Sequence, residues 1–77
     1  MVTSDDLVMT HHAQTESMDD GISRIEIAEA ISRGPRITEG NHFVTVYRYF
    51  TVVYEKMVGG KYKVITVHIG SPRGWKK

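Results

Sequence analysis

The chain has 77 residues, a formal net charge of +1 and no cysteine. A chain this short cannot fill two hydrophobic cores, so we expect one domain with its core at roughly residues 9–70 and a basic tail at 71–77. The lack of cysteine excludes disulfides, a thiolate nucleophile and a cysteine-ligated zinc site. The sequence predicts neither a signal peptide nor a membrane span, so we expect a cytoplasmic protein.

The charges are divided unevenly along the chain. Residues 1–40 carry three basic and eight acidic side chains, whereas residues 41–77 carry seven basic and one acidic side chain. The basic half could present a surface to a polyanion such as RNA. Alternatively, the two halves could simply attract each other within the fold.

The N-terminal region contains the signals of a short strand and a first helix. Residues 7–9 suit an edge strand. Thr10 suits the N-cap of a helix from about residue 11 to 19, because its hydroxyl can accept a hydrogen bond from a first-turn N–H. Gly21 can adopt the left-handed conformation that ends many helices.

A second helix is predicted by its capping pattern. Ser23 and Glu26 form a capping box, in which each side chain can bond the other residue's main-chain N–H. Gly34 and Pro35 end the helix. Between these signals an apolar stripe runs at helical spacing through Ile27, Ala28 and Ile31, with Ile22 just outside the helix.

From residue 36 onward, β-branched and aromatic residues predict strands. Gly59 and Gly60 predict a two-residue hairpin turn, in which Val58 faces Lys61. This register gives three inward pairs: Phe50 with Ile69, Val52 with Val67, and Tyr54 with Ile65. On the other face it pairs Thr51 with His68, Val53 with Thr66, and Glu55 with Val64. It also places Lys56 directly opposite Lys63.

For the segment before this hairpin, a straight strand has two faults, and a loop or a bulge could remove them. One straight strand over residues 43–58 would be unusually long and would point Arg48 at the core. A loop at residues 47–49 would instead turn two pairs inward: Val46 with Phe50 and Val44 with Val52. A bulge in one bent strand could also release Arg48 to solvent. Both alternatives give an α+β fold with two N-terminal helices on one face of a small antiparallel sheet.

Three strings taken in order resemble a known family: HAQTESMDDGISRIEIAEAISRG, then EG, then TVVYEKMVGGKYKVITVHI. Over roughly residues 9–69 the chain is similar to the bacterial and archaeal domain of unknown function 4258. The resemblance implies kinship with the RelE/ParE and BrnT class of small toxin folds, many of which are ribonucleases and some gyrase inhibitors. Those proteins place two helices against an antiparallel sheet and work from its exposed side.

The N-terminal part of the match contains two departures from the family pattern. His12 and Ala13 match the family's His-Ala pair. Glu16 and Asp20, however, stand where the family usually has arginines. If those arginines hold phosphate, carboxylates at these positions would repel RNA.

Three side chains are candidates for acid/base chemistry. His68 lies on the mixed strand face and near Tyr49 in the predicted register, so the two could assist attack by a ribose 2′-hydroxyl. His12 shares a helix face with Glu16. That pair is too small for a metal site, because zinc sites need three or four ligands. We therefore predict no metal and no cofactor. Alternatively, neither histidine takes part in catalysis.

Basic side chains gather near the glycine turn and in the tail. We predict nucleic-acid contacts from Lys56, Lys61, Lys63, Arg73 and Lys76. The strand lysines could equally protect a sheet edge from aggregation.

Three functions follow from these patterns. The first is a toxin-like protein that acts on RNA as a metal-independent ribonuclease through a basic open sheet face. The second is a module that binds RNA or the ribosome without cleavage. The third is a non-catalytic protein-interaction or dimerising domain, whose partner could be an antitoxin protein or a second copy of the chain.

Overall fold

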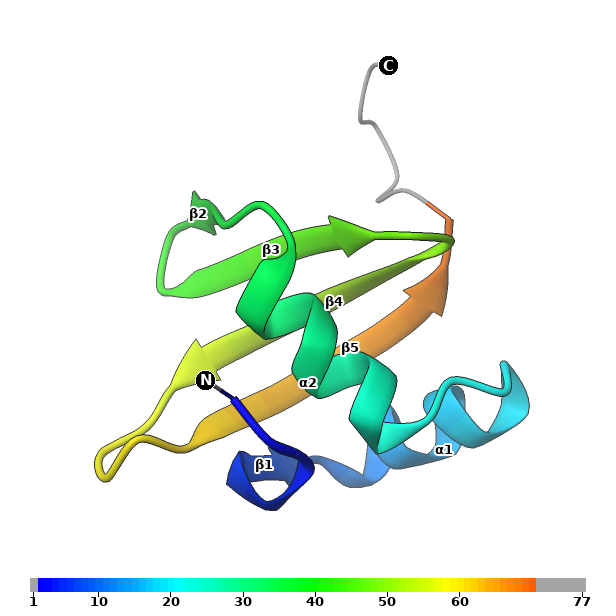
Figure 1. Ribbon diagram of the computed structural model, residues 1–77, viewed down its shortest axis with the longest axis horizontal. Coiled ribbons are helices and arrows are strands. Elements are labelled where there is room, and N and C mark those ends of the chain that lie inside the picture. The colour runs from blue at the N-terminus through cyan, green and yellow to red at the C-terminus, as the bar shows by residue number, and fades with distance from the viewer. Residues whose placement is uncertain (1, 71–77) are drawn as a thin grey trace.

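The computed structural model describes residues 2–70. Figure 1 shows two α-helices and a five-stranded sheet, with a short 3-10 helix near the N-terminus. In chain order the elements are η1 (Ser4–Asp6), β1 (Leu7–Met9), α1 (His11–Asp19), α2 (Arg24–Arg33), β2 (Ile37–Glu39), β3 (His42–Tyr47), β4 (Phe50–Lys56) and β5 (Tyr62–Ile69). The predicted α+β class and the two helices are therefore confirmed.

The strands form one sheet in the order β1-β5-β4-β3-β2. Strands β2 to β5 pair antiparallel with their neighbours, whereas β1 runs parallel to β5. The prediction of a purely antiparallel sheet is wrong in this respect. Both helices and three strands lie between β1 and β5, and such a long connection allows parallel pairing.

The helix boundaries follow the local signals. The Thr10 hydroxyl accepts a hydrogen bond from the Ala13 N–H at 3.1 Å, which starts α1. Ser23 and Glu26 form both bonds of the predicted capping box at the start of α2. Gly21, just beyond α1, has φ +70°. These interactions are local, so the sequence alone specifies them.

The end of α2 packs tightly against β3. Gly34 forms the C-cap of α2. A Cβ atom at this position would lie 2.6 Å from the Ala30 carbonyl oxygen and would also clash with the Thr45 hydroxyl. Glycine therefore permits this close approach of helix and strand.

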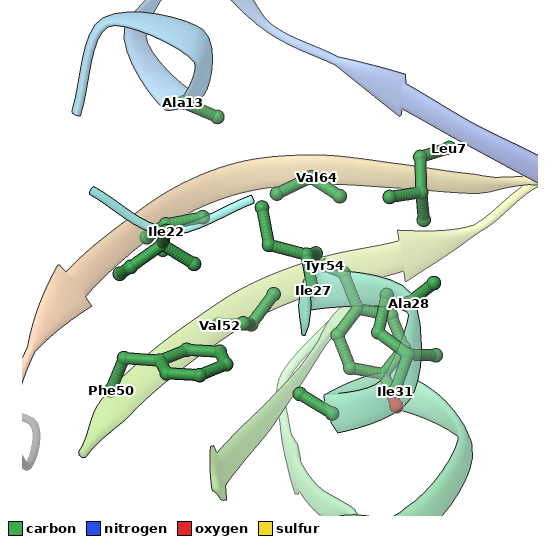
Figure 2. Close-up of a cluster of buried hydrophobic side chains, with 12 residues drawn as sticks. Leu7, Ala13, Ile22, Ile27, Ala28, Ile31, Phe50, Val52, Tyr54 and Val64 are labelled. Carbon is green, nitrogen blue, oxygen red and sulfur yellow. The ribbon is translucent and has the colours of Figure 1, made fainter. Parts of the chain in front are cut away.

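Both helices bury apolar side chains against the same face of the sheet (Figure 2). We call this the covered face and the opposite one the open face. The core consists of Leu7, Ala13, Ile22, Ile27, Ala28, Ala30, Ile31, Phe50, Val52, Tyr54, Val64 and Val67. Each large aliphatic or aromatic member contributes about 1.5–3 kcal/mol through burial.

The turn between β3 and β4 lies where the sequence predicted a break, but the predicted pairs are wrong. A two-residue loop, Arg48 and Tyr49, leaves Tyr47 opposite Phe50. Arg48 has φ +55°. The loop is one residue shorter than the predicted one, and side chains alternate along a strand, so the inward set changes. Phe43, Thr45 and Tyr47 turn to the covered face, and Val44 and Val46 to the open face.

The hairpin of β4 and β5 follows the predicted register only at the end away from its connecting turn. Thr51 pairs with His68 and Val53 with Thr66, as predicted, but a register shift follows Val53. Beyond it the pairs are Tyr54 with Val64, Glu55 with Lys63 and Lys56 with Tyr62. Near the turn, the Met57 N–H donates to the Lys61 carbonyl, so the loop has three residues rather than two. The core accordingly contains Val64 instead of Ile65.

Candidate interaction surface

The open face is the side of the sheet away from both helices. Figure 1 views the sheet from its covered side, with α2 crossing in front of the strands. The pairing pattern assigns these side chains to the open face: Val8, Ile37, Glu39, His42, Val44, Val46, Thr51, Val53, Glu55, Lys63, Thr66 and His68. They come from all five strands, so neighbouring strands place them side by side.

The centre of the open face is apolar. Val44 is buried, and Val46 and Val53 are half-buried. Neither Val46 nor Val53 belongs to the core cluster or packs against it. Towards the sheet edges, Ile37 is 36% and Val8 is 41% exposed. A contiguous apolar patch of this kind is a common feature of protein-binding surfaces.

Charged groups of both signs lie at one end of this patch. His42 Nδ1 lies 2.9 Å from Glu55 Oε2. Lys63 stands directly opposite Glu55 in the sheet. The predicted Lys56–Lys63 opposition is wrong, because the register shift places Lys63 opposite Glu55 on the open face and leaves Lys56 opposite Tyr62 on the covered face. The open face therefore has a mixed rather than a basic rim.

A second polar group lies at the α1 side of β5. Thr66 Oγ1 donates a hydrogen bond to Glu16 Oε1 at 2.8 Å, and His12 Nε2 lies 3.4 Å from the same oxygen. His68 is two residues beyond Thr66 and shares its face. The structure thus brings His12 and Glu16 to the strand that carries His68. Sequence reasoning missed Thr66, because 50 residues separate it from Glu16.

The predicted pair of Tyr49 and His68 is not formed. Tyr49 folds back towards α2, where its hydroxyl donates to Glu26 Oε2 at 3.2 Å, whereas His68 points to the open face. The short β3–β4 loop is the reason, because it turns Tyr49 towards the helix. Partial burial and then the Glu26 hydrogen bond raise the pKa of the Tyr49 phenol, which makes it a poor general base at neutral pH.

The same loop is attached to α2 by Glu29. Glu29 Oε2 accepts a hydrogen bond from the Tyr47 hydroxyl at 2.9 Å and from Arg48 Nη2 at 3.2 Å. Charge attraction to Glu29 raises the pKa of the Arg48 guanidinium. Glu29 follows Glu26 by about one helical turn, but no local sequence pattern marks it as a partner of Tyr47 and Arg48. This contact joins the acidic and basic halves of the chain.

The remaining predicted nucleic-acid contacts are dispersed. Lys61 Nζ donates to the Asp5 carbonyl at 3.3 Å, and Lys56 Nζ lies 5.8 Å from the Phe43 ring centroid. Arg73 and Lys76 lie outside the described residues. Among residues 2–70, the lysines therefore do not gather on the open face.

Residues 2–70 contain no cluster of three or more His, Asp or Glu side chains placed to hold a metal ion. No helix within that range is both long enough and apolar enough to span a bilayer.

Comparison with protein-family models, with curated proteins and with solved structures finds no match for this chain.

Proposed function

We propose that this protein is a protein-interaction domain that forms a homodimer through the open face of its sheet. The observation that supports the proposal is the partly exposed apolar surface of Val46 and Val53 on the open face, which neither helix covers. Packing two such faces together would remove this patch from water, as in a sheet-on-sheet sandwich.

The charges at the rim suit a second copy of the same chain. A two-fold interface brings the same surface of both copies together. A uniformly basic rim would repel itself, whereas a rim that carries Glu55, His42 and Lys63 can pair carboxylates of one copy with cations of the other.

The dimensions of the molecule also permit a dimer interface of standard size. The molecule measures 34 × 27 × 20 Å, and the view down its shortest axis shows the sheet broadside (Figure 1). The outline of the whole molecule in this view, 34 × 27 Å, is of the same order as the roughly 800 Å² that each partner buries in a standard interface.

The test is the oligomeric state of Val53→Lys, measured by sedimentation velocity over a range of concentrations. Val53 lies on the central strand β4, and each dimer would then bury two unpaired lysines near its centre. We expect the dimer dissociation constant to rise by about 100-fold or more. Val58→Lys is the matched control, because Val58 is fully exposed in the β4–β5 loop.

Two results would contradict the proposal. A wild-type protein that stays monomeric at all concentrations does not use the open face for self-association. A dimer that Val53→Lys leaves intact uses another surface, such as the edge of β2. If the monomer instead binds a different protein and Val53→Lys abolishes that binding, the open face is an interaction surface for that partner and not for a second copy.

A metal-independent ribonuclease of the toxin type is the second candidate. The observation that favours it is the arrangement of His12, Glu16 and Thr66 beside His68. In this hypothesis a carboxylate orients one imidazole, and a second imidazole on the same strand face as Thr66 serves as acid or base for 2′-hydroxyl attack.

RNA cleavage and RNA affinity test this second function. We expect His68→Ala to abolish cleavage while leaving the melting temperature nearly unchanged, because His68 is not part of the core. RNA affinity should fall steeply with salt, and reversing the charges of Lys61 and Lys63 should lower that slope by about one unit per lost phosphate contact. A wild-type protein that neither binds nor cleaves RNA at low salt would rule this function out.

A further inference from the structure

A cavity of about 350 Å³ lies between the N-terminal segment and the outer side of α2. Its volume falls within the roughly 300–1,000 Å³ typical of small-molecule sites. It belongs to neither the open face nor the group around His12, so its occupant does not depend on the function proposed above.

Hydrogen bonds hold the two walls of this cavity in place. The Val2 N–H donates to Ser32 Oγ at 3.0 Å, and the Ser32 hydroxyl donates back to the Val2 carbonyl at 3.4 Å. Arg24 Nη2 donates to the carbonyls of Ser4 and Leu7 at 3.0 and 3.1 Å. The N-terminal segment is therefore attached to α2 at two points, and the cavity lies preformed between them.

One part of the lining is apolar. Val2, Ile25 and Ala28 contribute aliphatic surface to the cavity. Ile25 is 71% exposed although it is a large aliphatic residue on a helix. A ligand with an aliphatic body would remove this surface from water, at about 25 cal/mol for each Å² that it covers.

The other part of the lining carries one carboxylate and one guanidinium, from Glu29 and Arg33. Glu29 Oε2 already receives hydrogen bonds from Tyr47 and Arg48. Arg33 Nη1, by contrast, lies 3.9 Å from that oxygen, and the Arg33 side chain is 63% exposed. Arg33 therefore has donors to spare, and a planar guanidinium fork matches a carboxylate.

We propose that this cavity binds a small aliphatic monocarboxylate, with its chain against Val2, Ile25 and Ala28 and its carboxylate on Arg33. The apolar wall selects the body of the ligand and the guanidinium selects its head group.

Octanoate is the probe, with octanol and octylamine as head-group controls of the same chain length. The binding is followed by amide chemical shifts of the full chain during titration. We expect saturable octanoate shifts confined to residues 2–4 and 25–33, and much weaker effects from the alcohol and the amine.

Two exposed positions provide the variants. Arg33→Gln should weaken octanoate binding by about tenfold or more, because it removes the charge and the bidentate fork. Ile25→Asp should weaken it as well, because it replaces aliphatic surface with a like charge. Arg36→Gln is the matched control, since Arg36 lies outside the cavity and near the Phe43 ring.

Three outcomes would overturn the proposal. The first is the absence of saturable octanoate shifts up to about 10 mM, a concentration range that covers even weak binding. The second is equal binding of octanol and octanoate. The third is an unchanged octanoate affinity in Arg33→Gln. Because Arg33 and Ile25 lie outside the core, none of these outcomes would merely reflect loss of the fold.

Discussion

The two faces of the sheet are built from the same strands but have different surroundings. Val52 and Val53 are consecutive residues of β4, yet Val52 is fully buried under the helices and Val53 is half-buried on the open face. The covered face therefore provides most of the stability, and the open face keeps apolar surface available for a partner. Burial, rather than hydrophobicity alone, separates the two roles.

Alanine at these two consecutive positions tests the difference most directly. Val52→Ala should lower the free energy of unfolding by about 2–3 kcal/mol, because it removes two buried methyl groups and leaves a cavity. Val53→Ala should cost less than about 1 kcal/mol in the monomer. Denaturant unfolding at low protein concentration measures both values. Equal losses would mean that the open face is covered in solution.

Gly34→Ala tests the close approach of α2 to the covered face. The added methyl group would press on the Ala30 carbonyl and the Thr45 hydroxyl. We expect a loss of about 1–3 kcal/mol from overpacking, seen as a lower midpoint in denaturant unfolding. Adding Thr45→Ala should restore part of the loss, because it removes one of the two clashes. A Gly34→Ala protein as stable as the wild type would show that α2 can move away from β3.

Tyr47→Phe tests the attachment of the β3–β4 loop to α2. It removes the hydrogen bond to Glu29 and should lower the free energy of unfolding by about 1 kcal/mol. Tyr62→Phe is the control, because the Tyr62 hydroxyl makes no hydrogen bond within residues 2–70 and should be lost at little cost. If both variants lose the same stability, the Tyr47 contact adds nothing specific.

The smallest expected effect concerns pH and Glu26. The Ser23 main-chain N–H, and more weakly the Tyr49 hydroxyl, hold the pKa of Glu26 below its usual 4.5. A lowered pKa stabilises the fold at pH above 4.5, and this contribution is lost as pH falls through the folded-state pKa. The difference in melting temperature between wild type and Glu26→Gln should therefore shrink on acidification.

Ser23→Ala provides the control for this pH effect. It keeps the main-chain N–H that lowers the pKa of Glu26 most, so most of the pH dependence should persist. A Glu26→Gln difference that is constant from pH 7 to pH 3 would contradict this account.

The sequence by itself determined the parts of the fold that depend on near neighbours. Thr10 and Ser23 start the helices through bonds to residues three positions away, so the residues that mark the helix starts are neighbours in the sequence. The alternation of apolar and mixed side chains in residues 50–53 and 66–69 likewise predicted how these two segments pair. It also predicted that His68 faces away from the helices.

Only the tertiary structure decided which apolar side chains of β3 face the helices. Both alternating sets of β3 contain apolar residues, so hydrophobicity did not distinguish Phe43 and Tyr47 from Val44 and Val46. The choice depended on the β3–β4 loop, which is one residue shorter than predicted, and a one-residue slip reverses every side chain. The contact of Glu16 with Thr66 and the cavity at Arg33 likewise join distant segments, and no local pattern in the sequence encodes such contacts.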